Sequence, residues 1–196
     1  MILEYLQRLA WDPTAPIPDG WPHGWYGVLL LFCIPGGVGI PPGVLLGHRN
    51  GLGIVVMTVL YFCSDVMLAF AFEPMLRVLA LAGRYVPAIE RLGQWTMHAI
   101  TRVMPAGGIA GPTGVVLTAL GAGLPFGRAL AAGAGYGLVA GWLLAIAGDM
   151  IYYLIGMTST LWFDGMLGDQ RVAAFAGLAV MLIVPVIIHR LRAATA

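Results

Sequence analysis

Charged residues are scarce in this 196-residue chain, where Asp, Glu, Lys and Arg together make up 10% of the sequence, against about a quarter in soluble proteins. The net charge of +1 provides no electrostatic basis for capturing nucleic acid or another acidic polymer. Hydrophobic residues make up 60%, and the mean hydropathy is +0.89. A water-soluble globule of this composition would expose too much apolar surface, so the sequence indicates a membrane protein.

Cysteine and catalytic motifs are scarce as well. The two cysteines, Cys33 and Cys63, both lie in apolar segments, which favours buried reduced thiols over a disulfide scaffold. The sequence contains no Gly-x-Ser-x-Gly nucleophile motif, no Gly-Lys-Ser/Thr phosphate loop and no His-Glu-x-x-His zinc motif. We therefore expect neither enzymatic activity nor a bound cofactor.

Glycine, by contrast, is plentiful. The 28 glycines are typical of transmembrane helices whose backbones approach closely. The chain has room for about five or six spans of roughly 20 residues each. The sequence therefore predicts an all-α, polytopic helical membrane protein with a single membrane domain over residues 1–196. Residues 1–23 lack the features of a cleavable signal, and we expect them to form an interfacial N-terminal segment.

Two segments rich in proline and glycine interrupt the apolar sequence, at 35–43 and 105–114. Neither can form a continuous helix, and broken backbone at membrane depth is tolerated only where protein buries it or where it lines a cavity. We therefore expect two pseudo-repeated halves with broken helices, at 24–83 and 105–196. An amphipathic helix at 84–104 would connect them. If it spans the membrane the halves are inverted, which we favour, and if it stays at the surface they are parallel.

The two halves share a pattern around one aspartate. Each contains Gly-x-Gly, an aliphatic residue and valine, with an aspartate twelve residues after the second glycine. Upstream, Pro41-Pro42-Gly43-Val44-Leu45-Leu46 corresponds to Pro112-Thr113-Gly114-Val115-Val116-Leu117. Paired interruptions at matching positions are a strong sequence indication of a transporter site. The alternative is chance recurrence in a glycine-rich chain.

The aspartates themselves, Asp65 and Asp149, are the leading candidates for function. A charge near the middle of a bilayer costs roughly 3 kcal/mol or more and usually marks a substrate, ion or proton path. Aromatic hydroxyl groups lie one helical turn away, at Tyr61 before the first aspartate and at Tyr152 and Tyr153 after the second. Because removal from water favours the neutral form of a carboxyl group, either aspartate could exchange protons near neutral pH. The alternative is a structural aspartate that accepts hydrogen bonds from its own helix or pairs with a buried arginine.

Pro41, Gly43, Pro112 and Gly114 are further candidates for substrate binding or coupling, because they belong to the broken segments. Helices that start within these segments would point the positive ends of their dipoles inward, and the breaks would leave free backbone groups. Both features suit a carboxylate or another anion. The alternative is a kink that serves only close packing. Glu73, which precedes a proline, is interpreted as an interfacial anchor.

We expect no metal site. Soft sulfur ligands at Cys63 and Met67 flank Asp65, a combination that could bind a transition metal such as copper. Their spacing of two residues, however, spreads the three side chains around a helix, and the sequence has no Cys-x-x-Cys or paired-histidine motif. Apolar packing by the sulfur residues is the simpler interpretation.

The chain resembles the LysE-type superfamily of small six-span exporters. The matching residues are Gly111-Pro112-Thr113-Gly114 and Gly148-Asp149-Met150-Ile151-Tyr152 in the second half, with Pro41-Pro42-Gly43 and Ser64-Asp65 as their echo in the first. The polar segment 84–104 departs from the plain third span of that family. The resemblance implies export of amino acids, small organic solutes or metal ions. The related thiol-disulfide electron carriers would need one cysteine in each half, and here both lie in the first.

These features together predict a secondary transporter or exporter in a cell inner (plasma) membrane, multi-pass and proton-coupled through Asp65 and Asp149. Two other functions stay open: a passive channel lined by the Pro/Gly breaks, and a membrane-embedded enzyme or assembly factor acting on lipid or protein. The expected partners are the lipid bilayer, a small-molecule or ion substrate and a second copy of the chain. A homodimer is expected because Gly133, Gly137 and Gly141 are spaced four apart, as in helix contacts.

Overall fold

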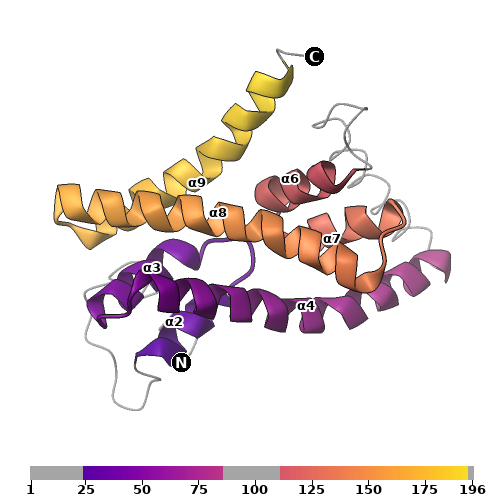
Figure 1. Cartoon of the computed structure of the whole chain (residues 1–196), viewed down its shortest axis with the longest axis horizontal. Coiled ribbons are helices and arrows are strands. Elements are labelled where there is room, and N and C mark those ends of the chain that lie inside the picture. Colours follow the sequence, from indigo (N-terminus) through magenta and orange to yellow (C-terminus); the bar gives the residue numbers. More distant parts are fainter. Residues whose placement is uncertain (1–23, 86–110, 194–196) are drawn as a thin grey trace. The chain divides into compact units, whose positions relative to one another are not determined.

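The computed structural model describes residues 24–85 and 111–193, and this part of the chain is helical with no strand. The prediction of an all-α fold is therefore confirmed. The predicted interfacial segment 1–23 lies outside the described residues, and so does the predicted connecting helix 84–104 apart from its first two residues. The helices are labelled in Figure 1: α2 (Trp25–Phe32), α3 (Ile40–Arg49), α4 (Ile54–Tyr85), α6 (Pro112–Ala122), α7 (Leu124–Gly133), α8 (Leu138–Leu167) and α9 (Gln170–Ala193).

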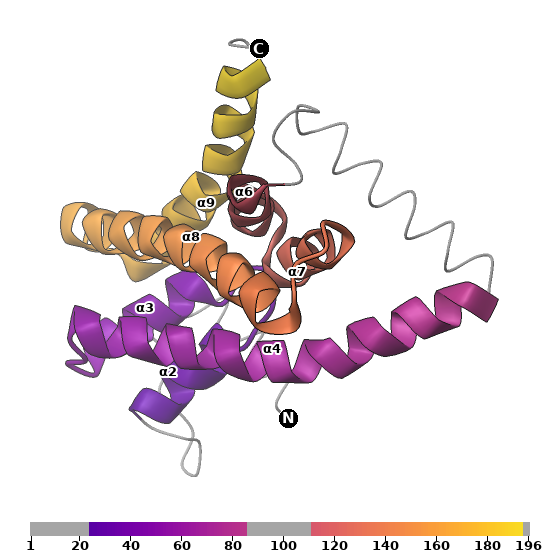
Figure 2. The same cartoon turned by 45° about the vertical axis from the view of Figure 1, so that its right-hand side comes forward.

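Four of these helices are too short to cross a bilayer. α2, α3, α6 and α7 have 8, 10, 11 and 10 residues, which corresponds to about 12 to 17 Å of length against a hydrocarbon core of about 30 Å. α2 packs against α3 and α6 against α7, so each pair forms a helical hairpin (Figure 2). The predicted interruption at 35–43 is confirmed in its first part, because α2 ends at Phe32 and the connection to α3 contains Gly36 and Gly37, whose φ angles are +88° and +75°.

A glycine allows close approach within each hairpin. A Cβ atom at Gly43 would lie 2.5 Å from the Phe32 ring, and a Cβ atom at Gly127 would lie 2.6 Å from the Cβ atom of Ala119. Both distances are shorter than van der Waals contact, so a larger residue at either position would push the two short helices apart. Gly43 and Gly127 occupy matching positions, the fourth residue of α3 and of α7.

The sequence predicts a turn at Pro125–Arg128, and this prediction is wrong. These residues form the beginning of α7, and the break lies before them at Gly123, whose φ of +95° ends α6. Proline is tolerated in the first turn of a helix, because the N–H group that it lacks would have no partner there. The turn that precedes the long helix α8 therefore lies at residues 134–137, after Gly133, and not before Ala129.

The turns that follow α3 and α7 have the same hydrogen bonds. After α3, the N–H groups of residues 50, 51 and 52 donate to the carbonyl groups of residues 46, 48 and 47. After α7, the N–H groups of residues 134, 135 and 136 donate to those of residues 130, 132 and 131, at distances of 2.9 to 3.1 Å. The central glycines Gly51 and Gly135 both have positive φ, +71° and +84°. This recurrence pairs α3 with α7, so the predicted correspondence of Pro41 with Pro112 does not match the turns. Pro125 is the proline in the matching position.

Residue contacts divide the chain into two compact units. Among described residues, the first contains α2, α3, α4 up to Ser64, α8 from Met150 and α9 up to Val184. The second contains α4 from Asp65, α6, α7, α8 up to Asp149 and the end of α9. Each long helix thus changes unit at its aspartate. The half-repeats expected at 24–83 and 105–196 are a different division of the chain, and they stay a prediction.

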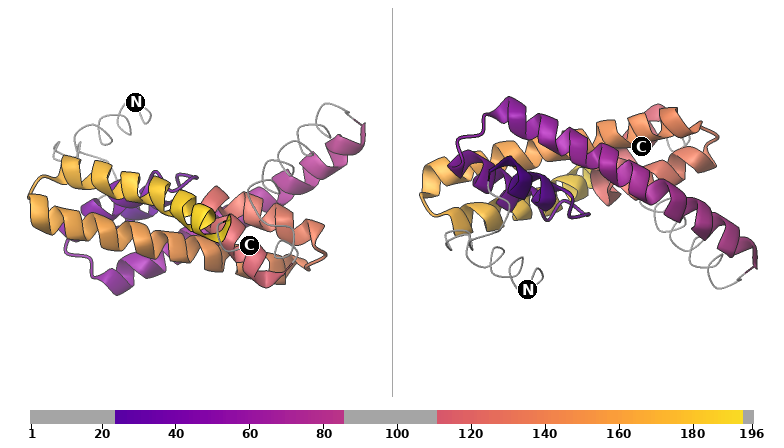
Figure 3. Two further views of the ribbon diagram at one scale, coloured as in Figure 1. Left: turned by 90° about the horizontal axis from the view of Figure 1, so that it is seen from above. Right: turned by 90° about the horizontal axis from the view of Figure 1, so that it is seen from below.

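The first unit has an aromatic and aliphatic core contributed by all of its helices. α9 lies alongside the C-terminal part of α8 (Figure 3), where Gly177 packs against Thr160 and Gly156 packs against Met181. In the second unit the core joins α6 to α7, with Val115, Leu130 and Ala131 buried together. The buried residues of the first core are Val28, Phe32, Ile40, Val44, Tyr61, Tyr153, Met157 and Met181.

The two long helices leave most of their apolar surface uncovered. α4 from Ile54 to Val78 and α8 are long and apolar enough to cross a membrane, yet only 22% and 39% of their most apolar stretches are buried. Phe70 is 80% exposed and Val55 75%. A core helix of a water-soluble protein would be mostly covered, so this surface supports membrane association. The described residues contain two such helices, and the larger number of spans stays a prediction.

The glycines expected to mediate a homodimer do not lie on one helix. Gly133 ends α7, Gly137 precedes α8 and Gly141 lies within α8. Gly141 is also buried in its own chain, where an added Cβ atom would lie 3.2 Å from the Cβ atom of Ala131. The physical reason given for dimerisation is therefore wrong, and the dimer itself stays a prediction.

Candidate functional site

The two aspartates lie against each other in the second unit. Asp65 comes from α4 and Asp149 from α8, and the two residues are 1% and 8% exposed. Their carboxyl groups are near enough to interact directly. Each aspartate is the twelfth residue of its helix, so the matching helix starts at Ile54 and Leu138 put both side chains at corresponding depths along the two helices. The fold thus brings together two carboxyl groups that are far apart in the sequence.

Asp65 has no polar neighbour that would compensate its charge. Both of its carboxyl oxygens are buried, and apart from the facing Asp149 carboxyl group no described residue donates a hydrogen bond to them. The described part of the chain therefore excludes both structural alternatives for Asp65, namely hydrogen bonds from its own helix and pairing with an arginine. A buried polar group without such a partner is unusual in proteins and calls for a functional explanation.

Small residues surround the aspartates within this unit. Ala69 and Ala145, one turn from Asp65 and Asp149 on their helices, are buried. Gly148 lies directly against α6, because a Cβ atom there would run into the carbonyl group of Val116 and lie 2.8 Å from the Cβ atom of Ala119. The residues one turn after Asp65 and one turn before Asp149 are therefore small and apolar, and α6 is closely packed against α8.

The tyrosines predicted to assist the aspartates belong to the core of the first unit. The rings of Tyr61 and Tyr153 stack with centroids 4.2 Å apart and planes at 15°, and Phe32 packs edge-on against both. The Tyr153 hydroxyl donates a hydrogen bond to the Met157 sulfur at 3.1 Å. Tyr152 packs at the side of this core. No tyrosine hydroxyl donates to Asp65, and the ring stack places Tyr61 and Tyr153 in the core of the first unit. The role of the three tyrosines in substrate binding or coupling stays a prediction.

The Pro/Gly candidates lie inside helices. Pro41 is buried in the first turn of α3, and Pro112 begins α6. The Gly43 N–H group donates to the Gly39 carbonyl at 3.0 Å, and the Gly114 N–H group donates to the Gly111 carbonyl at 3.0 Å. The expectation that the breaks leave these backbone donors free is therefore wrong, because both helices start earlier than expected and include the glycines.

The sulfur residues near Asp65 lie on other faces of α4. Cys63 is exposed, and Met67 is 54% exposed, whereas Asp65 is buried. The three side chains therefore point in different directions, in agreement with their spacing of two residues. Within the described ranges, no group of three or more His, Cys, Asp or Glu side chains is arranged to hold a metal ion.

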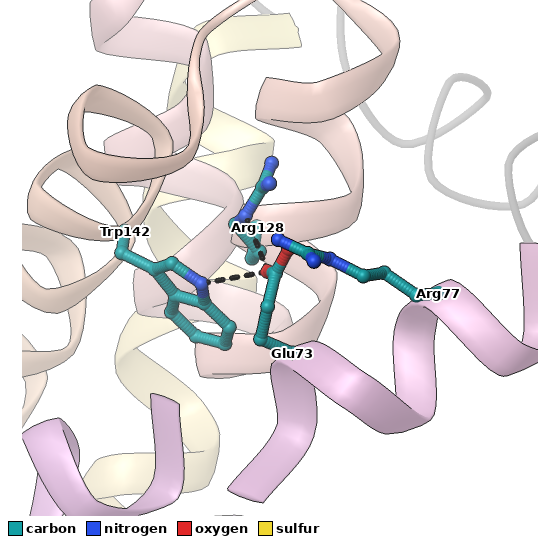
Figure 4. Close-up of polar contacts among 4 residues, drawn as sticks. All are labelled: Glu73, Arg77, Arg128 and Trp142. Atoms are coloured by element: carbon teal, nitrogen blue, oxygen red, sulfur yellow. Dashed lines mark hydrogen bonds and ion pairs between the residues drawn. The ribbon is translucent and has the colours of Figure 1, made fainter. Parts of the chain in front are cut away.

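A second polar cluster in the same unit centres on Glu73 (Figure 4). One of its carboxylate oxygens accepts a hydrogen bond from Arg77 Nε at 2.9 Å. The other accepts from Trp142 Nε1 at 2.9 Å and from Arg128 Nε at 3.3 Å. The cluster joins α4, α7 and α8. The carboxylate of Glu73 thus binds three side chains of the protein, and its interpretation as an interfacial anchor stays a prediction.

The two clusters show that α4 and α8 run antiparallel in this unit. Glu73 follows Asp65 by eight residues, whereas its partner Trp142 precedes Asp149 by seven. At 1.5 Å of rise per residue, the two polar sites are separated by about 10 to 12 Å along the helix axes. The second unit thus holds a carboxyl pair and an arginine cluster on the same pair of helices.

The sequence contains only part of the signal for this cluster. Glu73 and Arg77 are four residues apart on one helix, which is the spacing of a common ion pair. Arg128 and Trp142 are 55 and 69 residues away from Glu73, and only the packing of α7 and α8 against α4 brings them close. The turn predicted at Pro125–Arg128 also placed Arg128 outside a helix, whereas the structure shows it as a buried residue of α7.

Comparison with known proteins leaves the chain without an assigned relative. No family model matches it, and neither the curated proteins nor the solved structures give a match. The resemblance to the LysE-type superfamily therefore stays a prediction from short motifs.

Proposed function

We propose that this chain is a multi-pass protein of a cell inner (plasma) membrane that acts as a proton-coupled secondary transporter of a small solute or ion. The observation that carries this proposal is the buried contact between Asp65 and Asp149. Carboxyl groups in the membrane-spanning part of a protein are rare and usually mark a path for a substrate, an ion or a proton. The contact supports a single shared site.

Two carboxylates in contact within apolar surroundings cannot both be ionised at low cost. Two like charges about 4 Å apart repel by about 4 kcal/mol at an effective dielectric constant near 20, and no described donor offsets this repulsion at Asp65. The pair therefore holds a proton, as facing carboxyl groups in other proteins do. Contact with water would release that proton. If the pair opened alternately to the two sides of the membrane, it would carry protons across.

The short hairpins support a transporter architecture with broken helices. In our proposal α4 and α8 cross the bilayer, and the α2–α3 and α6–α7 hairpins enter it and return to the same side. The close contacts at Gly43 and Gly127 pack the two short helices of each hairpin tightly together, as expected for re-entrant hairpins that are held inside a protein. The identical turns after α3 and α7 support an origin from two related halves. The predicted five or six spans would then include the two hairpins.

The test is proton flux in proteoliposomes that hold an entrapped pH-sensitive dye. A panel of amino acids, small organic acids and divalent metal ions is added outside, with and without an imposed pH gradient. We expect that at least one solute moves together with protons in the wild type. Asp65→Asn and Asp149→Asn should each abolish coupled flux, because a single carboxyl group beside an amide no longer forms the pair.

Asp169→Asn is the matched control. Asp169 is exposed, and its side chain accepts a hydrogen bond from the Arg171 N–H group at the start of α9, which an amide oxygen can also accept. Its flux should equal that of the wild type. Full coupled flux in both Asp65→Asn and Asp149→Asn would rule out the mechanism. Flux that never runs uphill under a pH gradient would indicate a passive channel instead.

A further inference from the structure

The guanidinium group of Arg128 has an unused hydrogen-bonding side. Arg128 is only 8% exposed, and its Nε atom contacts the Glu73 carboxylate. Its Nη1 atom is buried and has no hydrogen-bond partner among the described residues. Figure 4 shows the two terminal nitrogens pointing away from Glu73. A buried guanidinium donor without a partner costs free energy, so its retention needs an explanation.

The surrounding residues hold this guanidinium group in one orientation. Glu73 fixes its Nε side, and the Trp142 ring lies beneath it, with the guanidinium carbon 5.9 Å from the ring centroid. Trp142 is itself fixed by its hydrogen bond to Glu73. The side chain is therefore oriented before any ligand arrives, which lowers the entropic cost of binding.

A glycine lies beside the free nitrogen. Gly141 on α8 faces Arg128, and a Cβ atom there would lie 3.1 Å from Nη1. Any residue larger than glycine would therefore crowd the unused donor. The charges of the cluster also fail to balance, because Arg77 and Arg128 carry two positive charges and Glu73 carries one negative charge. One anion would complete it.

We infer that Arg128 binds the carboxylate or phosphate group of an anionic ligand through its Nη atoms, with Glu73 and Trp142 as positioning residues. The planar fork of a guanidinium group matches the oxygens of both groups. As a statement about the transported solute, this inference rests on the proposed function and makes that solute an anion that moves with a proton. As a statement about a binding site, it stands without transport.

Titration calorimetry on the detergent-solubilised full chain tests the site, with inorganic phosphate and acetate as separate probes and no membrane gradient. We expect saturable binding of at least one probe. Arg128→Gln should weaken that binding tenfold or more, since hydrogen bonds to charged groups supply at least that much. Arg77→Gln is the matched control, because this arginine contacts the same carboxylate but is 64% exposed. It should weaken binding by no more than about threefold, because solvent screens the charge of an exposed arginine.

Two further variants keep the result decisive if Arg128→Gln folds poorly. Gly141→Ala leaves all charges in place but crowds Nη1, so it should also weaken binding. Arg128→Lys keeps the charge but loses the planar fork, and it should bind more weakly than the wild type. The absence of saturable binding of both probes to the wild type would overturn the inference, as would wild-type affinity in Gly141→Ala and Arg128→Lys.

A second arm distinguishes a free solute from a lipid headgroup. Phosphate binding is measured in nanodiscs of phosphatidylcholine alone and in nanodiscs that also contain phosphatidylglycerol. Equal affinity in both supports a free anion as the ligand, and competition by phosphatidylglycerol supports a lipid phosphate at the same site. Binding that persists when no coupled flux is found would leave the anion site standing and reject the proposed transport.

Discussion

Asp65 and Asp149 are in contact, buried, and each the twelfth residue of a long apolar helix. Apart from Asp149, no described residue donates a hydrogen bond to Asp65, so this contact is unfavourable unless the pair holds a proton. An arrangement that costs folding free energy and persists is the kind of local conflict expected at functional sites.

The first prediction concerns the cost of this arrangement to stability. Asp65→Asn replaces a carboxyl group that must take up a proton on folding with a neutral amide, which can also donate a hydrogen bond to Asp149. We expect the free energy of unfolding to rise by about 1 to 2 kcal/mol, measured by thermal unfolding in detergent at neutral pH. Asp169→Asn should stay within about 0.5 kcal/mol of the wild type, as exposed substitutions usually do. A destabilised Asp65→Asn protein would contradict the unfavourable contact.

The second prediction concerns the glycines of the two hairpins. Gly43→Ala and Gly127→Ala should each lower the free energy of unfolding by about 1 to 3 kcal/mol, because the added methyl group overlaps Phe32 in one case and Ala119 in the other. Gly127→Ala should cost more, since the contacts there include backbone atoms. The matched controls are Gly53→Ala and Gly137→Ala, where an added Cβ atom meets open space. Equal stability of all four variants would argue against close hairpin packing.

The third prediction compares the two ion pairs of Glu73, one with the buried Arg128 and one with the exposed Arg77. Glu73→Ala leaves Arg128 buried without its counter-charge and should cost about 3 kcal/mol or more. Arg77→Ala removes only an exposed ion pair and should cost less than about 1 kcal/mol. Chemical denaturation in detergent measures both. If the two losses were similar, Arg128 would not be buried as described.

The fourth prediction concerns Tyr153. Its hydroxyl contacts Met157 and its ring stacks on Tyr61, so Tyr153→Phe should lower stability by only about 0.5 to 1 kcal/mol and leave coupled flux unchanged. Tyr153→Ala should cost about 3 to 5 kcal/mol through the cavity that it leaves. Loss of flux in Tyr153→Phe would restore this hydroxyl group to the proton path.

Sequence patterns predicted the features that depend on local chemistry. Gly51 and Gly135 begin the two Gly-x-Gly motifs and have positive φ, which glycine adopts readily. Each motif therefore marks the turn before a helix that carries an aspartate. The break between α2 and α3 followed from the same property. Helix content and apolar surface followed from composition. These features are decided within a few residues of the sequence.

The errors arose where tertiary packing decides. Pro125 starts a helix because Gly123 ends the one before it, a choice that a Pro-Phe-Gly-Arg run does not reveal. The contact between Glu73 and Arg128 joins residues 55 positions apart, beyond the reach of any helical periodicity. The Pro-x-Gly match at Pro112 is too short to show which residues of the two halves correspond. The hydrogen bonds of the turns indicate that α3 corresponds to α7.

Infrared difference spectroscopy of the carboxyl groups tests the central claim most directly. The wild type at neutral pH should show the carbonyl stretch of a protonated carboxylic acid. That band should disappear in Asp65→Asn, which removes the more deeply buried carboxyl group. It should shift but remain in Asp149→Asn, because burial alone still favours the neutral form of Asp65, and it should be unchanged in Asp169→Asn. Absence of the band in the wild type, or its survival in Asp65→Asn, would contradict a proton held between Asp65 and Asp149.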